Sequence, residues 1–366
     1  METKIKEYFS KVLDSRVEGR CLHLLSDILL IGLCTYLSKG EDYEDMVLFA
    51  ETKGHLLPEL LTLPNGIPSH DTFNRTFKLI DNQSLKSCLI SHGRDILSVL
   101  TEKQIVLDGK KLRGATPKSR GNSGLYLVNA WVSENRLCVG QEKVQSKSNE
   151  ITAIPALLKE IDIVDSVVSI DAMGCQSAIA EQIIKQEGHY FLAVKSNQKE
   201  LFGQMVDSFS LAKPLTMEQE WEYDHGRFET RKCSILPAKR LLSKELLEKW
   251  TGIATLVQIE ACRHINGVIS QELRYYISDE KENNPLYFNK LARGHWGIEN
   301  HLHWHLDISF KEDDCRVRTG NAPENLSLLR KLALQIMTQV NDKLSIQKRR
   351  TKAAFDINYL KSVLKI

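Results

Sequence analysis

Two aspartates and one glutamate are the residues of this sequence best placed to hold a metal ion. Asp108 directly follows a short apolar, strand-like run, QIVL at 104–107. Asp171 follows a second such run, Val167–Ile170, and Glu299 lies in a segment with helical spacing. Neighbouring carboxylates repel each other unless a divalent cation neutralises them, and hard oxygen ligands select Mg²⁺ or Mn²⁺. For either aspartate taken alone, a residue that caps the segment after a strand is the simpler interpretation.

The segment around Glu299, Ala292–Arg318, is also rich in histidine and tryptophan. The residues concerned are His295, His301, His303, His305, Trp296 and Trp304. His301 and His305 are four residues apart, as in a helical zinc site, but Leu302 stands where a metalloprotease has its glutamate and no third ligand is indicated nearby. A zinc hydrolase is therefore disfavoured. In a third interpretation, the tryptophans pack in the core and the histidines line a solvated or DNA-facing helix.

The order of the expected elements can bring the two aspartates together. Strands are expected at 104–107, ending at Asp108-Gly109, and at Leu125–Val132, Leu137–Val144, Val167–Ile170 and Tyr190–Val194, with helices at Ile151–Ile161 and Gln176–Lys185. The first strand then pairs with two antiparallel neighbours on one side and, through a right-handed crossover, with a parallel strand on the other. In such a mixed sheet Asp108 and Asp171 face each other, and a helix at Pro285–Leu306 has to bring Glu299 to them.

The first hundred residues have helical periodicity. Helices are expected at Leu25–Leu37, with Ser26 or Asp27 as cap and Gly40 as stop, at Tyr43–Thr52, and at Ser69–Leu79 after a turn at Leu63–Pro68. Two short helices across a glycine-containing turn are compatible with a DNA-binding helix-turn-helix. A helical bundle with an ordinary charged surface fits at least as well.

The region 202–285 is again strand-like, where a direct connection to the last helix would be simplest. It contains a strand pattern at Trp221–Leu236 and a hairpin pattern at Ile259–Ile277 about an Asn-Gly pair. We therefore expect a β-rich insertion. Arg227 and Arg231 alternate onto one strand face, which could contact phosphates or could be a solvated edge whose charges oppose aggregation.

Composition limits the class of protein. The 366 residues are 26% charged and 42% apolar with a net charge of +2, so we expect a multidomain globular chain whose nucleic-acid contacts, if any, come from local basic clusters. One such cluster near the end comprises Lys348, Arg349, Arg350 and Lys352. The eight cysteines form no C-x-x-C pair, and the apolar run Ile28–Leu37 is too short to span a bilayer. We expect reduced thiols and a soluble, cytoplasmic protein without membrane contact.

Long motifs of the chain resemble one family of bacterial enzymes. They are LDGKKLRG, KSNEITAIPALL, SIDAMGCQ, FLAVKSNQ, HGRFETR, RYYIS and RGHWGIENHLHWHLDISFKEDDCRVRTGNAPENLSLLR. Together they resemble the ISAs1 family of DDE transposases, which includes the H-repeat-associated proteins of Rhs elements. The resemblance runs from the LSDILL helix to the terminal NYLKSVL.

The resemblance implies an α/β fold with a ribonuclease H-like mixed sheet flanked by helices, a β-rich insertion and a helical N-terminal domain. The implied units are 1–100, helical and DNA-binding or associated; 101–201 with 286–340, catalytic; 202–285, the insertion; and 341–366, a basic C-terminal tail or helix. Asp108 and Asp171 correspond to the two catalytic aspartates and Glu299 to the glutamate, which together hold two Mg²⁺ or Mn²⁺ ions.

Other residues take expected roles from the same resemblance. Asn300 and Asp307 would support the metal ligands without binding the metal themselves. Contacts to DNA are expected from Lys110, Lys111, Arg113, Lys195, Arg227, Arg231, Arg293, His295, Arg316 and Arg318. Two positions depart from the related IS4-like enzymes: His295 replaces their usual arginine and Leu306 a frequent lysine, so the pattern of phosphate contacts differs.

The implied activity is metal-dependent cleavage and strand transfer at inverted-repeat DNA ends. The partners would be double-stranded DNA, both terminal repeats and target, and a second copy of the chain on paired ends, in a bacterial cytoplasm at the nucleoid. The alternative is a catalytically silent DNA-binding or regulatory descendant of such an enzyme.

Overall fold

The computed structural model describes residues 4–17, 19–97, 103–115, 125–144, 150–224, 227–265 and 268–366. Its centre is a mixed sheet whose first five strands follow the order β3-β2-β1-β4-β5. Their bounds are β1 (Lys103–Leu112), β2 (Leu125–Val132), β3 (Leu137–Lys143), β4 (Ser166–Ile170) and β5 (His189–Val194). Strand β1 pairs antiparallel with β2 and parallel with β4, which confirms the predicted arrangement.

One boundary in this sheet was predicted wrongly. We expected β1 to end at Asp108-Gly109, whereas it continues to Leu112. The parallel neighbour β4 stops beside Leu107, but the antiparallel neighbour β2 continues, with Asp108 opposite Asn129 and the pairing extending to the end of β1. Asp108 therefore lies inside a strand, beside the point where the neighbouring strand has ended.

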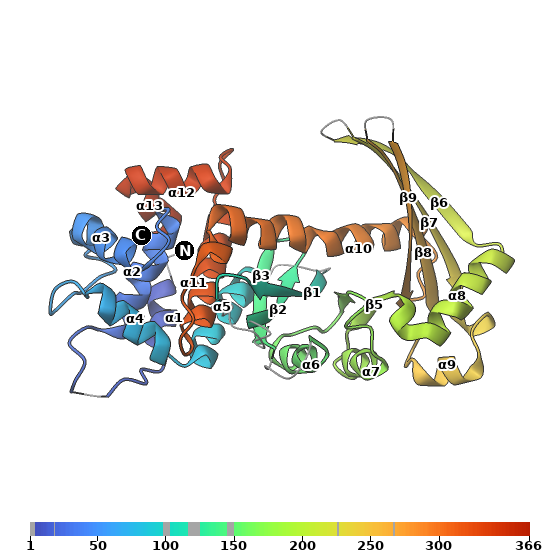
Figure 1. Ribbon diagram of the computed structural model, residues 1–366, viewed down its shortest axis with the longest axis horizontal. Coiled ribbons are helices and arrows are strands. Elements are labelled where there is room, and N and C mark those ends of the chain that lie inside the picture. Colours follow the sequence, from blue (N-terminus) through green and yellow to red (C-terminus); the bar gives the residue numbers. More distant parts are fainter. Residues whose placement is uncertain are drawn as a thin grey trace.

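Four long strands extend the same sheet instead of forming a separate one. They are β6 (Leu215–Asp224), β7 (Arg227–Pro237), β8 (Thr255–Ile265) and β9 (Val268–Ser278). Strand β9 pairs antiparallel with β5, and the order continues β9-β8-β7-β6 to the far edge (Figure 1). Pairing of Ile265 with Val268 confirms the predicted hairpin, although the Asn-Gly turn itself lies outside the described residues. Helices α8 (Lys199–Leu211) and α9 (Lys244–Lys249) also belong to this region.

Helices cover both faces of the sheet. On one face lie α6 (Glu150–Glu160) and α7 (Ser177–Lys185), close to the predicted ranges. On the other lies α10 (Pro285–Ile298), whose Phe288 and Leu291 pack with Phe191 of β5 and Val257 of β8. Figure 1 shows α10 running from the long strands β6–β9 across the sheet to a cluster of helices at the opposite end.

That helical cluster combines both ends of the chain. Its members are α1 (Ile5–Ser10), α2 (Leu25–Leu37), α3 (Tyr43–Lys53), α4 (His70–Leu79), α5 (Asn82–Leu97), α11 (Ala322–Thr338), α12 (Ile346–Phe355) and α13 (Ile357–Leu364). Short 3₁₀ turns occur at Gly54–Leu56, Ser196–Gln198, Ala238–Arg240 and Glu312–Asp314. A single apolar core includes residues from all eight helices and from β1, β2 and β3. The N-terminal helices thus share their core with the C-terminal ones.

The expected cap of α2 was wrong. The N-cap is Leu24, without a side-chain hydrogen bond, and Asp27 is buried. The Asp27 carboxylate instead accepts hydrogen bonds from the backbone N–H groups of Thr62 (3.1 Å) and Leu63 (2.8 Å). In α4 the N-cap is Ser69, whose side chain accepts a hydrogen bond from the Thr72 N–H group.

The two arginines of the basic C-terminal cluster are buried rather than available for nucleic-acid contacts. Arg349 binds Asp342 at 2.7 Å, and the fully buried Arg350 donates to the backbone oxygens of Tyr36 (2.7 Å), Gly40 (3.2 Å) and Ser309. These guanidinium groups hold the helical cluster together, so they do not form a free DNA-binding tail.

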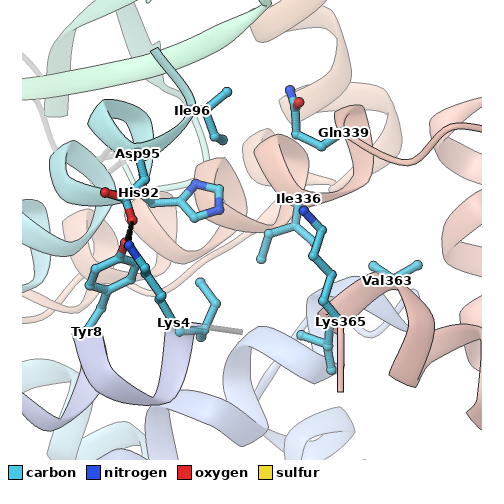
Figure 2. Close-up of a pocket in the computed structure, with 11 residues that line it drawn as sticks. Lys4, Tyr8, His92, Asp95, Ile96, Ile336, Gln339, Val363 and Lys365 are labelled. Atoms are coloured by element: carbon cyan, nitrogen blue, oxygen red, sulfur yellow. Dashed lines mark hydrogen bonds and ion pairs between the residues drawn. The ribbon is translucent and has the colours of Figure 1, made fainter. Parts of the chain in front are cut away.

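A small cavity of about 120 Å³ lies inside this cluster, between α1, α5, α11 and α13. Figure 2 shows Lys4 and Tyr8 directed at the carboxylate of Asp95, with His92 beside them. Lys4 Nζ lies 3.0 Å from Asp95 Oδ2, and the Tyr8 hydroxyl donates to the same oxygen. The described lining is otherwise largely aliphatic, and the one carboxylate among its described residues already has partners, so these residues offer no metal site. Within the described residues, no helix is both long and apolar enough to cross a membrane.

Candidate active site

Asp108 and Asp171 lie next to each other at the end of β4. Leu107 pairs with Ile170 in the parallel ladder, so the following residue of each strand is an aspartate at the same level. One carboxylate oxygen of Asp171 accepts hydrogen bonds from the backbone N–H groups two and three residues later, at 3.0 and 3.2 Å. Asp171 therefore caps the turn after β4 with one oxygen, and its other oxygen remains for the site.

Asp108 is held in a strongly acidic environment. Burial and, after it, three nearby carboxylates raise the pKa of Asp108 to about 8; these are Glu299, Asp171 and Glu150. Such a concentration of negative charge is unfavourable without a counter-charge, and a divalent cation supplies one.

Glu150 is a site residue that the sequence interpretation missed. It begins α6, and burial followed by the charge of Asp171 raises the pKa of its carboxyl. Gly109 makes room for it, since a Cβ at that position would lie 1.9 Å from Glu150 Oε1. The Asp-Gly pair in β1 thus allows a fourth carboxylate to approach the two aspartates.

Glu299 enters the site from a helix that changes its geometry at that residue. We expected a regular helix to Leu306, but α10 ends at Ile298 and two π-helical turns follow, Glu299–His303 and His305–Ser309. The N–H of Trp304 accordingly donates to the carbonyl of Glu299, five residues back. Such wide turns are rare and occur frequently at functional sites.

The wide turns match a strict four-residue spacing in the sequence. The buried apolar residues of this segment are Ile298, Leu302, Leu306 and Phe310. In an α-helix, residues four apart drift by about 40° per step, whereas a wider turn keeps them on one side. The polar set Glu299, His303 and Asp307 has the same spacing, and all three face β1.

His303 lies between two of the carboxylates. Its Nδ1 is 3.4 Å from Glu299 Oε2 and 3.6 Å from Asp108 Oδ2, and its Nε2 is 3.4 Å from the side-chain nitrogen of Asn129. The hydrogen bond with His303 lowers the pKa of Glu299. Ligand atoms of Asp108, Glu299 and His303 all lie within 4.8 Å of one another, and among the described residues they form the candidate metal-binding group.

Asp108, Asp171 and Glu299 line a cavity of about 520 Å³. Lys195 and Trp296 are exposed at its edge. The carboxylate oxygens fit Mg²⁺ or Mn²⁺.

Comparison with known proteins agrees with this geometry. The family model of the transposase DDE domain matches residues 99–336, and the model of the DDE-transposase-associated domain matches residues 6–93. The chain belongs to the DDE transposase family. The H repeat-associated protein YhhI of Escherichia coli K12 is 38% identical, over 99% of this chain and 97% of YhhI.

Two further relatives belong to the same comparison. An uncharacterised protein of Xanthobacter autotrophicus is 40% identical over 75% of this chain and 93% of its own length. A short E. coli K12 relative, named inactive transposase YbfQ, is 40% identical over 20% of this chain and 86% of its own length. These matches confirm the resemblance to H-repeat-associated DDE transposases.

Several residues expected to contact DNA in such a transposase are engaged elsewhere. Lys110 lies two residues after Asp108 on the same face of β1, with its side chain only 7% exposed. Its ammonium lies 2.6 Å from Asp307, 3.1 Å from Glu312 and 3.5 Å from Asp313. Lys110 is thus an internal ion-pair partner, and Asp307 supports it rather than a metal ligand.

His295 also differs from its expected role in the transposase. Its Nδ1 lies 3.2 Å from Ser169 Oγ, and burial lowers its pKa to about 4. The ring is therefore neutral near pH 7 and does not replace the positive charge of the arginine found in related enzymes. It lines the cavity beside Glu299.

Other arginines expected to contact DNA belong to the β-rich region and to the loop after the π-helical turns. Arg231 forms an ion pair with Glu229 at 2.7 Å, and the side chain of Arg227 lies outside the described residues. Arg316 and Arg318 line a separate hollow, where Arg318 Nε donates to the Gly114 carbonyl at 3.0 Å.

The remaining expected DNA contacts lie on or near the surface. Lys111 lies over the ring of Tyr126, and the Arg113 side chain is 81% exposed. Lys195 and Arg293 are exposed residues, and so is Asn300, which was expected to support the metal ligands.

The histidine pair that suggested a zinc site does not converge on a ligand set. His301 stacks on Trp131 with 6.2 Å between ring centroids, and His305 Nδ1 lies 3.1 Å from Ser309 Oγ. Neither histidine belongs to the metal-binding group found among the described residues. The tryptophans, which one alternative interpretation placed in the core, are partly exposed: Trp304 is 50% exposed, and Trp296, 44% exposed, lies against the Arg274 guanidinium.

Proposed function

We propose that this chain is a metal-dependent DNA transposase that cuts DNA at inverted-repeat element ends and joins the freed ends to a target. The observation that carries the proposal is the convergence of Asp108, Asp171 and Glu299 in one cavity, from two neighbouring strands and one helix. The strand order of β1–β5 supports a ribonuclease H-like catalytic unit, formed by 101–201 with 286–340.

Each residue then has a chemical task. When bound, two Mg²⁺ or Mn²⁺ ions would activate a water or 3′-hydroxyl and stabilise the leaving oxygen. Asp108 and Glu299 would hold cations between β1 and the π-helical turns, while Asp171 offers its uncapped oxygen from β4. Glu150, at the start of α6, adds negative charge that favours a second cation.

DNA is proposed to approach across the open side of the cavity. Lys195 lies at its edge, and Trp296 offers an aromatic surface braced by Arg274, which is itself bound to Glu272 at 2.7 Å. The N-terminal helices 1–100 would add further DNA contacts. Because two element ends must be processed together, a homodimer is the proposed working form.

The test is strand cleavage by the purified chain. Duplex DNA carrying the sequences that flank the gene is incubated with Mg²⁺ or Mn²⁺. Nicking is expected from the unaltered protein and is expected to disappear in Asp108→Ala, Asp171→Ala and Glu299→Ala. Glu248→Ala, which removes an exposed carboxylate on α9, is the matched control and should cleave normally.

The same assay distinguishes an active transposase from a catalytically silent DNA-binding descendant. Cleavage that survives all three substitutions would rule out the assigned site. Specific DNA binding without scission by the unaltered protein, in the presence of either ion, would instead identify a silent DNA-binding descendant. Short terminal inverted repeats bounded by target duplications around the gene would independently support a mobile element.

A further inference from the structure

We propose that His303 is a nitrogen ligand of the divalent cation at Asp108 and Glu299, and that Asn129 positions its ring. This inference rests on the proposed metal-dependent function and adds to it a residue outside the three carboxylates. It starts from the position of Nδ1, which faces one oxygen from each carboxylate, at 3.4 and 3.6 Å.

These distances suit a shared cation. An octahedral cation with ligands at ~2.1 Å separates adjacent ligand atoms by ~3 Å. The three candidate ligand atoms therefore need only small shifts to surround one ion. His303 itself is only 5% exposed, and the π-helical turn places it on the same side as Glu299. Its ring is thus held in place before any ion binds.

Asn129 provides the second, independent observation. It is fully buried, and it stands directly opposite Asp108 in the β1–β2 ladder. Its side-chain nitrogen faces His303 Nε2, while its Oδ1 has no hydrogen-bond partner within the part of the chain that the structure describes. A buried amide oxygen without a donor is uncommon and calls for a reason.

The two orientations of the Asn129 amide correspond to two states of His303. When the amide nitrogen donates to Nε2, the ring proton resides on Nδ1 and is shared with the carboxylates. When the amide turns by half a rotation, Oδ1 accepts a hydrogen bond from the Nε2–H group, and the Nδ1 lone pair faces the carboxylates. Metal-bound histidines regularly donate their other ring N–H to an oxygen in this way. A cation at Nδ1 would thus give the unpartnered Oδ1 a donor.

A nitrogen ligand also affects which ion is preferred. A site built only from carboxylates suits Mg²⁺, whereas imidazole binds transition metals more readily. We therefore expect Mn²⁺ to depend on His303 more strongly than Mg²⁺ does.

The experiment is Mn²⁺ binding to the full chain, with and without linear duplex DNA. Calorimetry gives the affinity, and pulsed electron paramagnetic resonance detects nitrogen bound directly to Mn²⁺. The unaltered protein is expected to show a ¹⁴N coupling that becomes a ¹⁵N coupling when its histidines are ¹⁵N-labelled. The labelling arm needs no substitution and so does not depend on a variant that folds.

Substitutions then assign the signal. His303→Gln should abolish the nitrogen coupling and weaken Mn²⁺ binding by ten- to a hundredfold. His301→Ala and His305→Ala, on the same π-helical segment, should retain the coupling. Asn129→Ala should weaken binding about tenfold while the coupling persists, because the ligand remains but its support is lost.

The outcomes separate this inference from the proposed function. Mn²⁺ binding that requires Asp108 but shows no histidine nitrogen would overturn the role of His303 and leave the carboxylate site intact. A coupling that persists in His303→Gln would also overturn it. Absence of any Asp108-dependent Mn²⁺ binding, with or without DNA, would remove the proposed metal-dependent function as well.

Discussion

The ammonium group of Lys110 lies 3.1 Å from Glu312 Oε2, and both side chains are almost completely buried. Although burial opposes it, the charge of Glu312 raises the pKa of Lys110, and the ammonium also binds Asp307 and Asp313. This ion-pair group connects β1 to the segment that follows the π-helical turns. It fixes the position of the helix carrying Glu299 relative to the strand carrying Asp108.

Replacing Lys110 by methionine should lower the free energy of unfolding by about 3–5 kcal/mol, because it leaves the Glu312 carboxylate buried without its nearest cation. Urea denaturation measures the change. Arg113→Ala, at the exposed edge of the same acidic group, should cost at most about 1 kcal/mol. An equal decrease in the free energy of unfolding in the two variants would show that the buried pair of Lys110 and Glu312 stabilises the chain no more than the exposed pair does.

The pH dependence of stability should reveal the acidic site. The pKa of Asp108 is about 8 in the folded chain and about 3.9 when unfolded. Between these values the folded state binds the extra proton, so the cation-free protein loses stability as pH rises from about 4 to 8. Asp108→Asn removes this loss. In thermal unfolding with EDTA, the melting temperature of Asp108→Asn minus that of the unaltered chain should increase by at least about 3 °C from pH 5 to pH 8.

The exposed Asp207→Asn variant on α8 is the control for that experiment, and its difference from the unaltered chain should not vary with pH. Adding Mn²⁺ at pH 8 should restore the lost stability of the unaltered chain, whereas it should not stabilise Asp108→Asn. A parallel pH response in all three proteins would contradict the elevated pKa.

Two glycine substitutions should have opposite effects. A Cβ at Gly114 would lie 2.3 Å from the carbonyl oxygen of Cys315 and 2.5 Å from that of Asp313, so Gly114→Ala must displace backbone and should destabilise the chain. Gly203 lies exposed within α8 with nothing near its Cβ position. Gly203→Ala should therefore stabilise the chain by about 0.5–1 kcal/mol, measured by chemical denaturation. A stabilising Gly114→Ala would disprove the close approach.

Loss of Arg350 should loosen the end of the π-helical segment. Its guanidinium binds three backbone oxygens and stacks on Phe310, 4.2 Å from the ring centroid. Hydrogen bonds to a charged group contribute about 1.5–3 kcal/mol each, so Arg350→Ala should cost about 3 kcal/mol or more. Hydrogen exchange at the Phe310 amide, which binds the His305 carbonyl, should become faster. The exposed Lys348→Ala variant should leave both quantities unchanged.

Periodicity was sufficient to predict the central sheet. Each strand from β1 to β5 contains a short apolar run, and crossover handedness leaves few ways to pair them. The position of Asp108 beside Asp171 followed from that order. The end of β1 did not, because its last residues are held by the antiparallel ladder with β2, and Lys110 and Lys111 within it do not form an apolar pattern.

The least predictable parts of the site depend on contacts distant in sequence. Glu150 lies within the KSNEITAIPALL motif, but nothing in its local sequence indicates that it reaches the aspartates, which it does because Gly109 leaves space for it. Lys110 resembles a surface lysine until Glu312, about two hundred residues later, folds against it. His303 did have a signal, since the spacing of 298, 302, 306 and 310 repeats at 299, 303 and 307. A strict repeat of four departs from the 3.6 residues of an α-helix and indicates a wider turn.

The order of synthesis determines when the contacts of Arg350 can form. Every proposed site residue precedes α12, yet the carbonyl of Ser309 and the ring of Phe310 obtain their guanidinium partner only from that helix. A ribosome that has just completed the Glu299 segment therefore carries a nascent chain in which Ser309 and Phe310 still lack this partner. Their contacts with Arg350 form only after Ile346–Phe355 has left the exit tunnel.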